Sequence, residues 1–427
     1  MNTFRKYHIL LFSALSISHV SKAFSWTDTT DGPRKLYAAA SARQGSLVER
    51  QNFVLKDYYV GMDVKLGWQT DDRDRNIFDV SYRYPRYGVG YYMGNMNGII
   101  LGDDSISAGL GKPAALYAYF GAPVYRDKWF SVGYNISAGF SYNFNSYNPE
   151  HSPSNILIGY KNNAYLEFSF EASLLLPGYS TLSAGISFQH FSNGSYQKPN
   201  KGINLISGTI AYQWNLYKNK DKRYTPIALP EWTKSFEWDV FIGSGVRMLD
   251  TGFDKKRPRE GKRWTCLTFS TAALRQVSHR RKWGAGIELF YYEWGSYVDS
   301  YHSAYKELIK DMGLRNPGVV SPSSSEVQRV MKSNAKFSSD NFTVGIYAAH
   351  EVGYKRLWLI TDLGIYPFPR VGDQPSSPII YERLGARVEL TDRLFVGVAI
   401  KAHGFKADFT EWSVGYALMK KKPMSMI

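Results

Sequence analysis

His190 and Ser192 are the residues of this chain whose types and spacing could perform nucleophilic chemistry. A serine hydroxyl becomes a nucleophile when a nearby imidazole takes its proton. The two residues stand two positions apart, and in a β-strand such side chains share one face. Stepping back from Ser192 in twos, that face also carries Phe188, Ile186, Ala184 and Leu182. The reactive pair is therefore predicted on the apolar face of its strand.

The apolar face of a strand turns outward into lipid when the strand belongs to a membrane β-barrel. Residues 1–23 have a basic start, a short apolar run and small residues before the end of the segment, which predicts a signal peptide cleaved after Ala23. No later segment offers about 18 consecutive apolar residues, so transmembrane helices are not predicted. We therefore expect residues 24–427 to form a β-barrel in a bacterial outer membrane.

Composition and alternation support an all-β, antiparallel barrel. The chain contains 32 Tyr, 24 Phe and 11 Trp, which suits the aromatic girdles of outer-membrane barrels. Apolar residues alternate with polar or small ones over residues 236–243, 342–349, 394–401 and 411–418, the period of a strand with one face in lipid. Counting such segments predicts about 14 to 16 strands in one barrel. Cys266 and His403 fall on the opposite, lumenal parity and are predicted to be structural.

Connections alternate in length, as expected when short periplasmic turns face long external loops. Short turns are predicted at 177–178, 279–282, 353–356 and 391–393, and long loops at 143–162, 193–203, 249–262, 297–340 and 368–377. The longest loop, 297–340, contains two stretches of helical spacing, which would make it either a cover over the barrel mouth or an ordinary surface loop. One connection, 218–233, falls on the periplasmic side although it is long.

The strand that carries the reactive pair rises from a short turn, so Ser192 is predicted at the external rim. The returning strand places Asn204 on its own apolar face, and a hairpin that pairs residue 192 with 204 and 190 with 206 would set Asn204 beside both reactive residues. Asn204 would orient the imidazole, while the Asn193 side chain and the Gly194 amide would stabilise the oxyanion. These parts predict a carboxylic ester hydrolase with a lipid-facing Ser-His-Asn site.

The segment His190-Phe191-Ser192-Asn193-Gly194, followed by Pro-Asn-Lys-Gly-Ile-Asn at 199–204, resembles the outer-membrane lipid A 3-O-deacylase family, also called acyloxyacyl hydrolases. The segment 401–412 resembles the larger members of this family. The resemblance implies removal of a fatty acyl chain from lipid A on the barrel exterior. The family places Glu fourteen residues after the His, where this chain has Asn204. The outer-membrane phospholipase A family has Asn at that spacing.

Two other functions stay open beside the lipid A deacylase. A phospholipase A would fit Asn204, and calcium dependence, which is typical of that family, would favour it; the sequence itself requires no metal or cofactor. A passive porin or adhesin is the second alternative, because a barrel of more than about 12 strands could leave a lumen. The net charge of +15 favours a phosphorylated glycolipid such as lipopolysaccharide as partner, and no nucleic-acid motif accompanies it. Whether the active form is a homodimer is left open.

Overall fold

The computed structural model describes residues 36–48, 54–71, 76–102, 109–127, 129–176, 180–216, 228–232, 234–248, 263–293, 295, 341–368 and 379–420. The predicted signal peptide at 1–23 and the helical stretches predicted within 297–340 lie outside these residues. In the part of the chain that is described, no helix is both long enough and apolar enough to cross a membrane.

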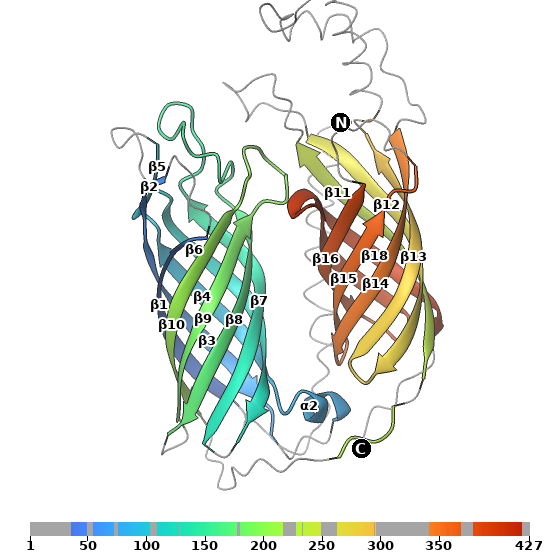
Figure 1. The fold of residues 1–427 in the computed structure, drawn as a ribbon, viewed down its shortest axis with the longest axis horizontal. Helices are drawn as coiled ribbons and strands as arrows, with labels where there is room; N and C mark the ends of the chain where they lie inside the picture. The colour runs from blue at the N-terminus through green and yellow to red at the C-terminus, as the bar shows by residue number, and fades with distance from the viewer. Residues whose placement is uncertain are drawn as a thin grey trace, which may run out of the picture. The chain divides into compact units, whose positions relative to one another are not determined.

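The first part of the chain closes into an eight-stranded antiparallel barrel (Figure 1). Its strands are β1 (Leu36–Leu47), β3 (Tyr59–Gln69), β4 (Arg86–Asn95), β6 (Gly111–Arg126), β7 (Phe130–Phe144), β8 (Asn163–Leu175), β9 (Ser180–Ser192) and β10 (Ile203–Asn215). The barrel closes because β1 pairs with β3 on one side and with β10 on the other. The short strands β2 (Val54–Asp57) and β5 (Ile99–Leu101) pair separately at the long-loop end, and the helix α2 (Ile77–Ser81) lies between β3 and β4.

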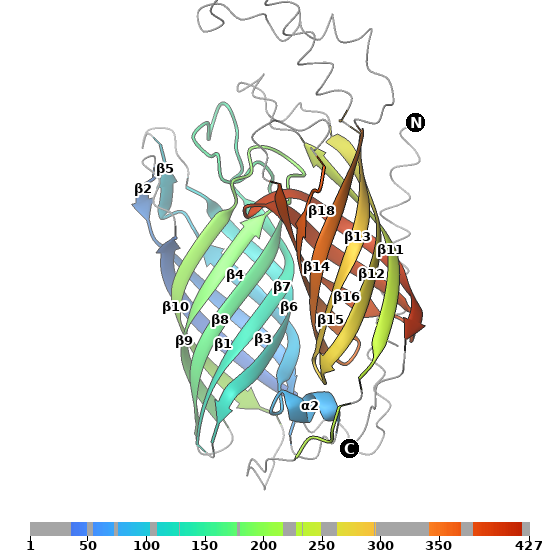
Figure 2. The ribbon, with the colours of Figure 1, turned by 45° about the vertical axis from the view of Figure 1, so that its right-hand side comes forward.

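The second part forms another closed antiparallel barrel of eight strands, seen from a second direction in Figure 2. Its strands are β11 (Phe236–Met248), β12 (Arg263–Ser278), β13 (Arg281–Tyr292), β14 (Phe342–Tyr354), β15 (Leu357–Ile365), β16 (Ile380–Glu389), β17 (Leu394–His403) and β18 (Lys406–Lys420). Pairing of β11 with β18 closes this barrel, with a register irregularity between Trp238 and Asp239.

The all-β antiparallel fold is therefore confirmed, while the grouping of its strands is corrected. The sequence predicts a single barrel over residues 24–427, and the structure divides its strands between two barrels because β10 returns to β1 instead of continuing to β11. The anomalous connection at 218–233 falls between β10 and β11 and so joins the two barrels. An eight-stranded barrel has an interior just wide enough for side chains, which removes the wide lumen expected of 14 to 16 strands.

The alternation predicted from the sequence sets the two faces of each strand. In β11, Phe236, Trp238 and Ile242 are exposed, whereas Glu237 and Asp239 are buried in the barrel interior. The exposed side chains of the other strands are also largely apolar. Each barrel therefore has an apolar outer surface and a polar interior. This arrangement is the one that outer-membrane barrels require.

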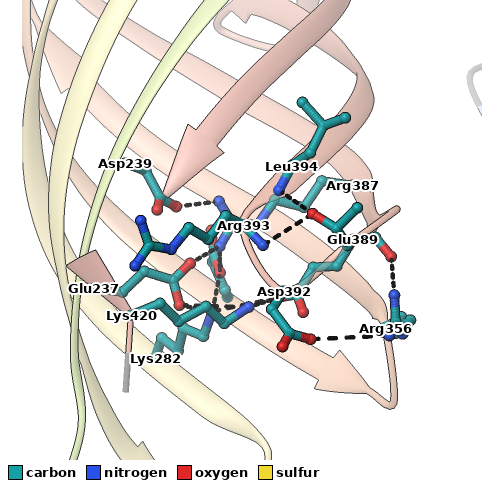
Figure 3. Close-up of polar contacts among 12 residues, drawn as sticks. Glu237, Asp239, Lys282, Arg356, Arg387, Glu389, Asp392, Arg393, Leu394 and Lys420 are labelled. Carbon is teal, nitrogen blue, oxygen red and sulfur yellow. Dashed lines mark hydrogen bonds and ion pairs between the residues drawn. The ribbon is translucent and has the colours of Figure 1, made fainter. Parts of the chain in front are cut away.

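Charged groups fill the interior of the second barrel. Near the short-turn end, Lys282 Nζ lies 2.8 Å from Glu237 Oε2, and Arg387 Nη2 lies 2.7 Å from Glu237 Oε1 (Figure 3). Midway, Arg383 Nη2 lies 2.7 Å from Glu288 Oε2. These pairs are buried, so charged side chains fill this lumen along the described strands.

Lumenal positions predicted for Cys266 and His403 are confirmed in the same barrel. Cys266 is buried and forms no disulfide. His403 Nε2 lies 2.9 Å from the Tyr366 hydroxyl and faces the buried Asp408. Both residues therefore belong to the packed interior and neither reaches the lipid-facing wall.

Candidate active site

Phe191, between the two reactive residues, anchors the end of β9 in the first barrel. Its side chain points inward and is fully buried, with its ring centroid 5.2 Å from that of Tyr165, 5.2 Å from Phe144 and 6.2 Å from Tyr92. Because side chains alternate along a strand, fixing Phe191 inward forces His190 and Ser192 toward the outside. The aromatic cluster thus positions the reactive pair.

His190 meets Asn204 across the pairing of β9 with β10. The two residues are direct partners in the register, and His190 Nδ1 lies 2.6 Å from Asn204 Oδ1. An amide oxygen only accepts hydrogen bonds, so Nδ1 carries the proton and donates it. The other ring nitrogen, Nε2, is then the unprotonated one that can act as a base.

Ser192 is the last residue of β9, two positions beyond His190 on the same face of the strand. Its register partner is Ala164, and its side chain is outward in parity but only 4% of the residue is exposed. The Ser192 Oγ accepts hydrogen bonds from Asn200 Nδ2 at 3.0 Å and from the Gly194 amide at 3.3 Å. Two N–H donors therefore converge on the hydroxyl, and no hydrogen bond joins it to His190 in this structure.

Two details of the predicted site are corrected. Asn204 pairs with His190, not with residue 192, because the register is displaced by two residues from the predicted one. The Asn193 side chain points away from the reactive oxygen: its Nδ2 donates to the Gln197 carbonyl at 2.9 Å and its Oδ1 accepts from the Gln197 amide at 3.2 Å. Asn193 therefore shapes the turn after the serine, whereas the Gly194 amide does face the hydroxyl as expected.

Asn200 is the site residue that sequence reasoning does not assign. Besides its bond to Ser192, its Oδ1 accepts from the Asn193 backbone amide at 3.2 Å, which holds the carboxamide in place. Its only signal in the sequence is its position in the segment 199–204 that carries the family resemblance. Its location beside the nucleophile depends on how the loop folds back.

The loop 193–202 folds back through three left-handed residues. Gly194 has φ of 59°, Ser195 of 65° and Gly202 of 81°. The returning arm is fixed to the preceding long loop, since the Lys201 amide donates to Ile156 O at 3.3 Å and the Gly202 amide to Leu157 O at 3.0 Å. These bonds bring the Asn200 carboxamide over Ser192.

The assembled groups can perform acyl transfer. A hydroxyl, a tautomerically fixed imidazole and two N–H donors are the parts of nucleophilic ester cleavage. Apo sites commonly hold their catalytic hydrogen bonds open until substrate binds, so the absence of a His190 to Ser192 bond is compatible with this chemistry. Among the residues described, no group of three or more His, Cys, Asp or Glu side chains could hold a metal ion.

Two protein-family models match the chain, and each matches the part that forms one of the two barrels. Residues 58–213, within the first barrel, match the family model described as lipid A 3-O-deacylase (PagL). Residues 236–421, which cover the second barrel, match the model described as acyloxyacyl hydrolase, C-terminal domain. The candidate site lies entirely in the part matched by the deacylase model. No curated protein matches the chain.

Several solved outer-membrane structures overlay on parts of the chain. The outer membrane enzyme PagL shares 18% identity, covers 40% of this chain and 97% of its own, and gives a TM-score of 0.26. The β domain of the Bordetella autotransporter BrkA shares 9% identity over 90% of this chain and 98% of its own, with a TM-score of 0.23. An outer membrane channel from Pseudomonas putida shares 7% identity over 92% and 98%, with a TM-score of 0.22. At scores this low, none of these overlays bears on function.

Proposed function

Because this chain belongs to the lipid A 3-O-deacylase family of the bacterial outer membrane, we propose that it hydrolyses the 3-O-linked acyl ester of lipid A with Ser192 as the nucleophile. The observation that carries the proposal is the outward-facing His190 to Asn204 hydrogen bond of 2.6 Å on the strand end that bears Ser192. An imidazole and a carboxamide bonded on a lipid-facing wall have little structural use there, since polar groups in that position are costly.

In the proposed reaction, His190 Nε2 takes the proton of the Ser192 hydroxyl as Oγ attacks the acyl carbonyl. The carbonyl oxygen becomes an oxyanion, and Asn200 Nδ2 and the Gly194 amide, which now donate to Oγ, lie close enough to turn toward it. Collapse breaks the bond between the acyl carbon and the sugar oxygen, and His190 gives the proton to that oxygen, which leaves as a sugar hydroxyl. Water then cleaves the acyl-serine by the same route.

Asn204 orients the imidazole without adding a charge. A carboxylate there would stabilise the imidazolium more strongly, but it would also place a second ionised group on a wall of low dielectric constant. The proposed role of Asn204 is therefore to fix the tautomer and the ring orientation. The transient imidazolium is partnered by a neutral amide oxygen.

The test measures fatty acid released from purified lipid A by the full chain, for wild type, Ser192→Ala and His190→Ala. We expect release to fall by at least about 10³-fold in both variants. Ser183→Ala is the matched control, because Ser183 lies on the same strand but bonds Ser173 Oγ at 2.8 Å inside the barrel. Full release by Ser192→Ala would refute the assignment. If the protein releases no fatty acid but lets small solutes pass into liposomes, the result would favour the alternative function of a passive porin.

A second substrate deserves the same assay because one observation favours it. Asn204 stands where the better-known deacylases have Glu, and outer-membrane phospholipases A have Asn at that spacing. Phospholipid is therefore offered in parallel, with calcium and with a chelator. We expect fatty acid to be released from lipid A both with calcium and in the presence of the chelator. Calcium-dependent release from phospholipid alone would reassign the protein as a phospholipase A.

A further inference from the structure

The outer wall of the second barrel carries a basic and aromatic cluster that the proposed hydrolysis does not use. Trp283 of β13 is 51% exposed, and its ring centroid lies 4.3 Å from that of His350 on β14. Arg275 of β12 is the register partner of Trp283 on its other side. Arg281 precedes Trp283 by two residues and shares its face. We call these four residues the Arg-Trp-His cluster.

The charge of the Arg-Trp-His cluster is not compensated. Arg275 and Arg281 are both exposed, and neither forms an ion pair in the part of the chain that the structure describes. The carboxylates on the same strands, Glu288 on β13 and Glu351 on β14, point into the barrel and are buried. The neighbouring outward side chains are apolar or uncharged: Ala273, Val277, Ala285, Ala348, Val352, Leu359 and Thr361. An anionic partner is therefore favoured on this face.

The position of the cluster indicates what kind of anion it meets. Two short turns, at 279–280 and 355–356, lie at this end of the barrel, which is the periplasmic end of an outer-membrane barrel. Arg275 and Trp283 lie only a few residues from the first turn, hence within roughly 10–15 Å of the rim. Tryptophan is enriched at this interface, and an arginine on the lipid face costs little there, in contrast to the bilayer midplane.

We propose that the Arg-Trp-His cluster binds the headgroup of an anionic phospholipid of the periplasmic leaflet. The two guanidinium groups are suited to the phosphodiester, since their planar forks bond phosphate oxygens in pairs. The indole of Trp283 spans the level of the headgroup and the ester groups, while the apolar neighbours contact the acyl chains. A free phosphate would leave this apolar surface unused, so the structure favours a lipid. The inference is independent of hydrolysis at Ser192.

The experiment measures lipid binding by the full chain in detergent, using native mass spectrometry with phosphatidylglycerol and phosphatidylcholine in competition. We expect wild type to prefer phosphatidylglycerol, and R275Q/R281Q to weaken that binding about 30-fold while binding of phosphatidylcholine is unaffected. The control K112Q/K406Q removes two exposed lysines from the opposite, long-loop ends of the barrels and should change nothing. The heat-dependent gel mobility of each variant reports barrel folding.

Two further variants test the contributions of Trp283 and Arg275 separately in the same lipid-binding experiment. Trp283→Ala should weaken both lipids, because it removes apolar contact as well as headgroup contact. The single variant R275Q, at an exposed position, keeps the test valid if the double variant folds poorly, and we expect it to lose about fivefold in affinity for phosphatidylglycerol. Equal binding of the two lipids by wild type, unchanged binding by folded R275Q/R281Q, or displacement of phosphatidylglycerol by equimolar inorganic phosphate would each overturn the proposal.

Discussion

At the residue scale, Asn200 shows how a side chain remote from any reactive pattern becomes part of a site. Its Nδ2 lies 3.0 Å from Ser192 Oγ, so it is placed to donate to the oxyanion once the hydroxyl has reacted. We expect Asn200→Ala to lower the rate of acyl release by about 10²–10³-fold, the usual loss for one oxyanion donor. The effect should fall on kcat, with KM little changed.

Asn143→Ala is a control for that measurement. Asn143 is exposed on β7, and its Nδ2 donates to the Lys112 carbonyl at 2.9 Å, away from the serine. Its loss removes an equivalent carboxamide from the same end of the barrel. If Asn143→Ala and Asn200→Ala reduce release equally, Asn200 has no specific role in the reaction.

A second residue-scale prediction concerns Asn204. Asn204→Leu removes the acceptor that holds His190 Nδ1, so the imidazole loses its fixed tautomer. By analogy with removal of the residue that orients the histidine in serine proteases, we expect kcat to fall by about 10²–10⁴-fold. Asn204→Gln keeps an amide oxygen and should restore part of the rate. Wild-type release by Asn204→Leu would show that the hydrogen bond orients nothing needed for catalysis.

At the element scale, the loop 193–202 decides whether the site forms. Gly202 has φ of 81°, and a Cβ there would lie 3.0 Å from His190 Cε1. We expect Gly202→Ala to displace the imidazole or the loop and to lower acyl release at least tenfold, with the barrel intact in gel mobility. Gly208→Ala on β10 is the matched control, because no atom lies within 4 Å of its Cβ. Equal activities would show that the loop tolerates the change.

The same loop limits what the sequence predicts about the site. Parity along β9 and β10 correctly placed His190 and Asn204 outward, because the period of a strand is two. The predicted register was displaced by two residues, an even number that leaves the faces unchanged. The displacement arises in a ten-residue loop whose left-handed residues, including Ser195, follow no strong sequence rule. For that reason Asn193 was misplaced and Asn200 was missed.

At the scale of the whole molecule, strand identity was predictable but barrel closure was not. Alternation depends on neighbours along the chain, whereas closure depends on whether β10 pairs with β1 or with β11, and both solutions satisfy the same local pattern. One local sign did exist, since the connection at 218–233 is too long for a periplasmic turn within a barrel. The interior of each eight-stranded barrel is filled by its own side chains, so neither barrel has the wide lumen of a passive porin.

Because each barrel closes on itself, the two should lose their structure separately. Arg383 is 2% exposed in the second barrel and lies 2.7 Å from Glu288 Oε2, 3.3 Å from Glu411 Oε1 and 3.4 Å from Asp362 Oδ2. Arg383→Met leaves three buried carboxyl groups without their cation, which should destabilise the second barrel by about 3–5 kcal/mol. Exposed Arg393→Met, which removes a cation from the surface of the same barrel, should have little effect.

Limited proteolysis during a urea titration follows the second barrel, and acyl release follows the first. We expect Arg383→Met to expose residues 236–420 at lower urea than wild type, while the urea dependence of acyl release stays unchanged. This outcome follows because β1 and β10 complete the hydrogen bonding of the first barrel without any strand of the second. Loss of acyl release in step with cleavage of the second barrel would instead mean that the two barrels form one cooperative unit.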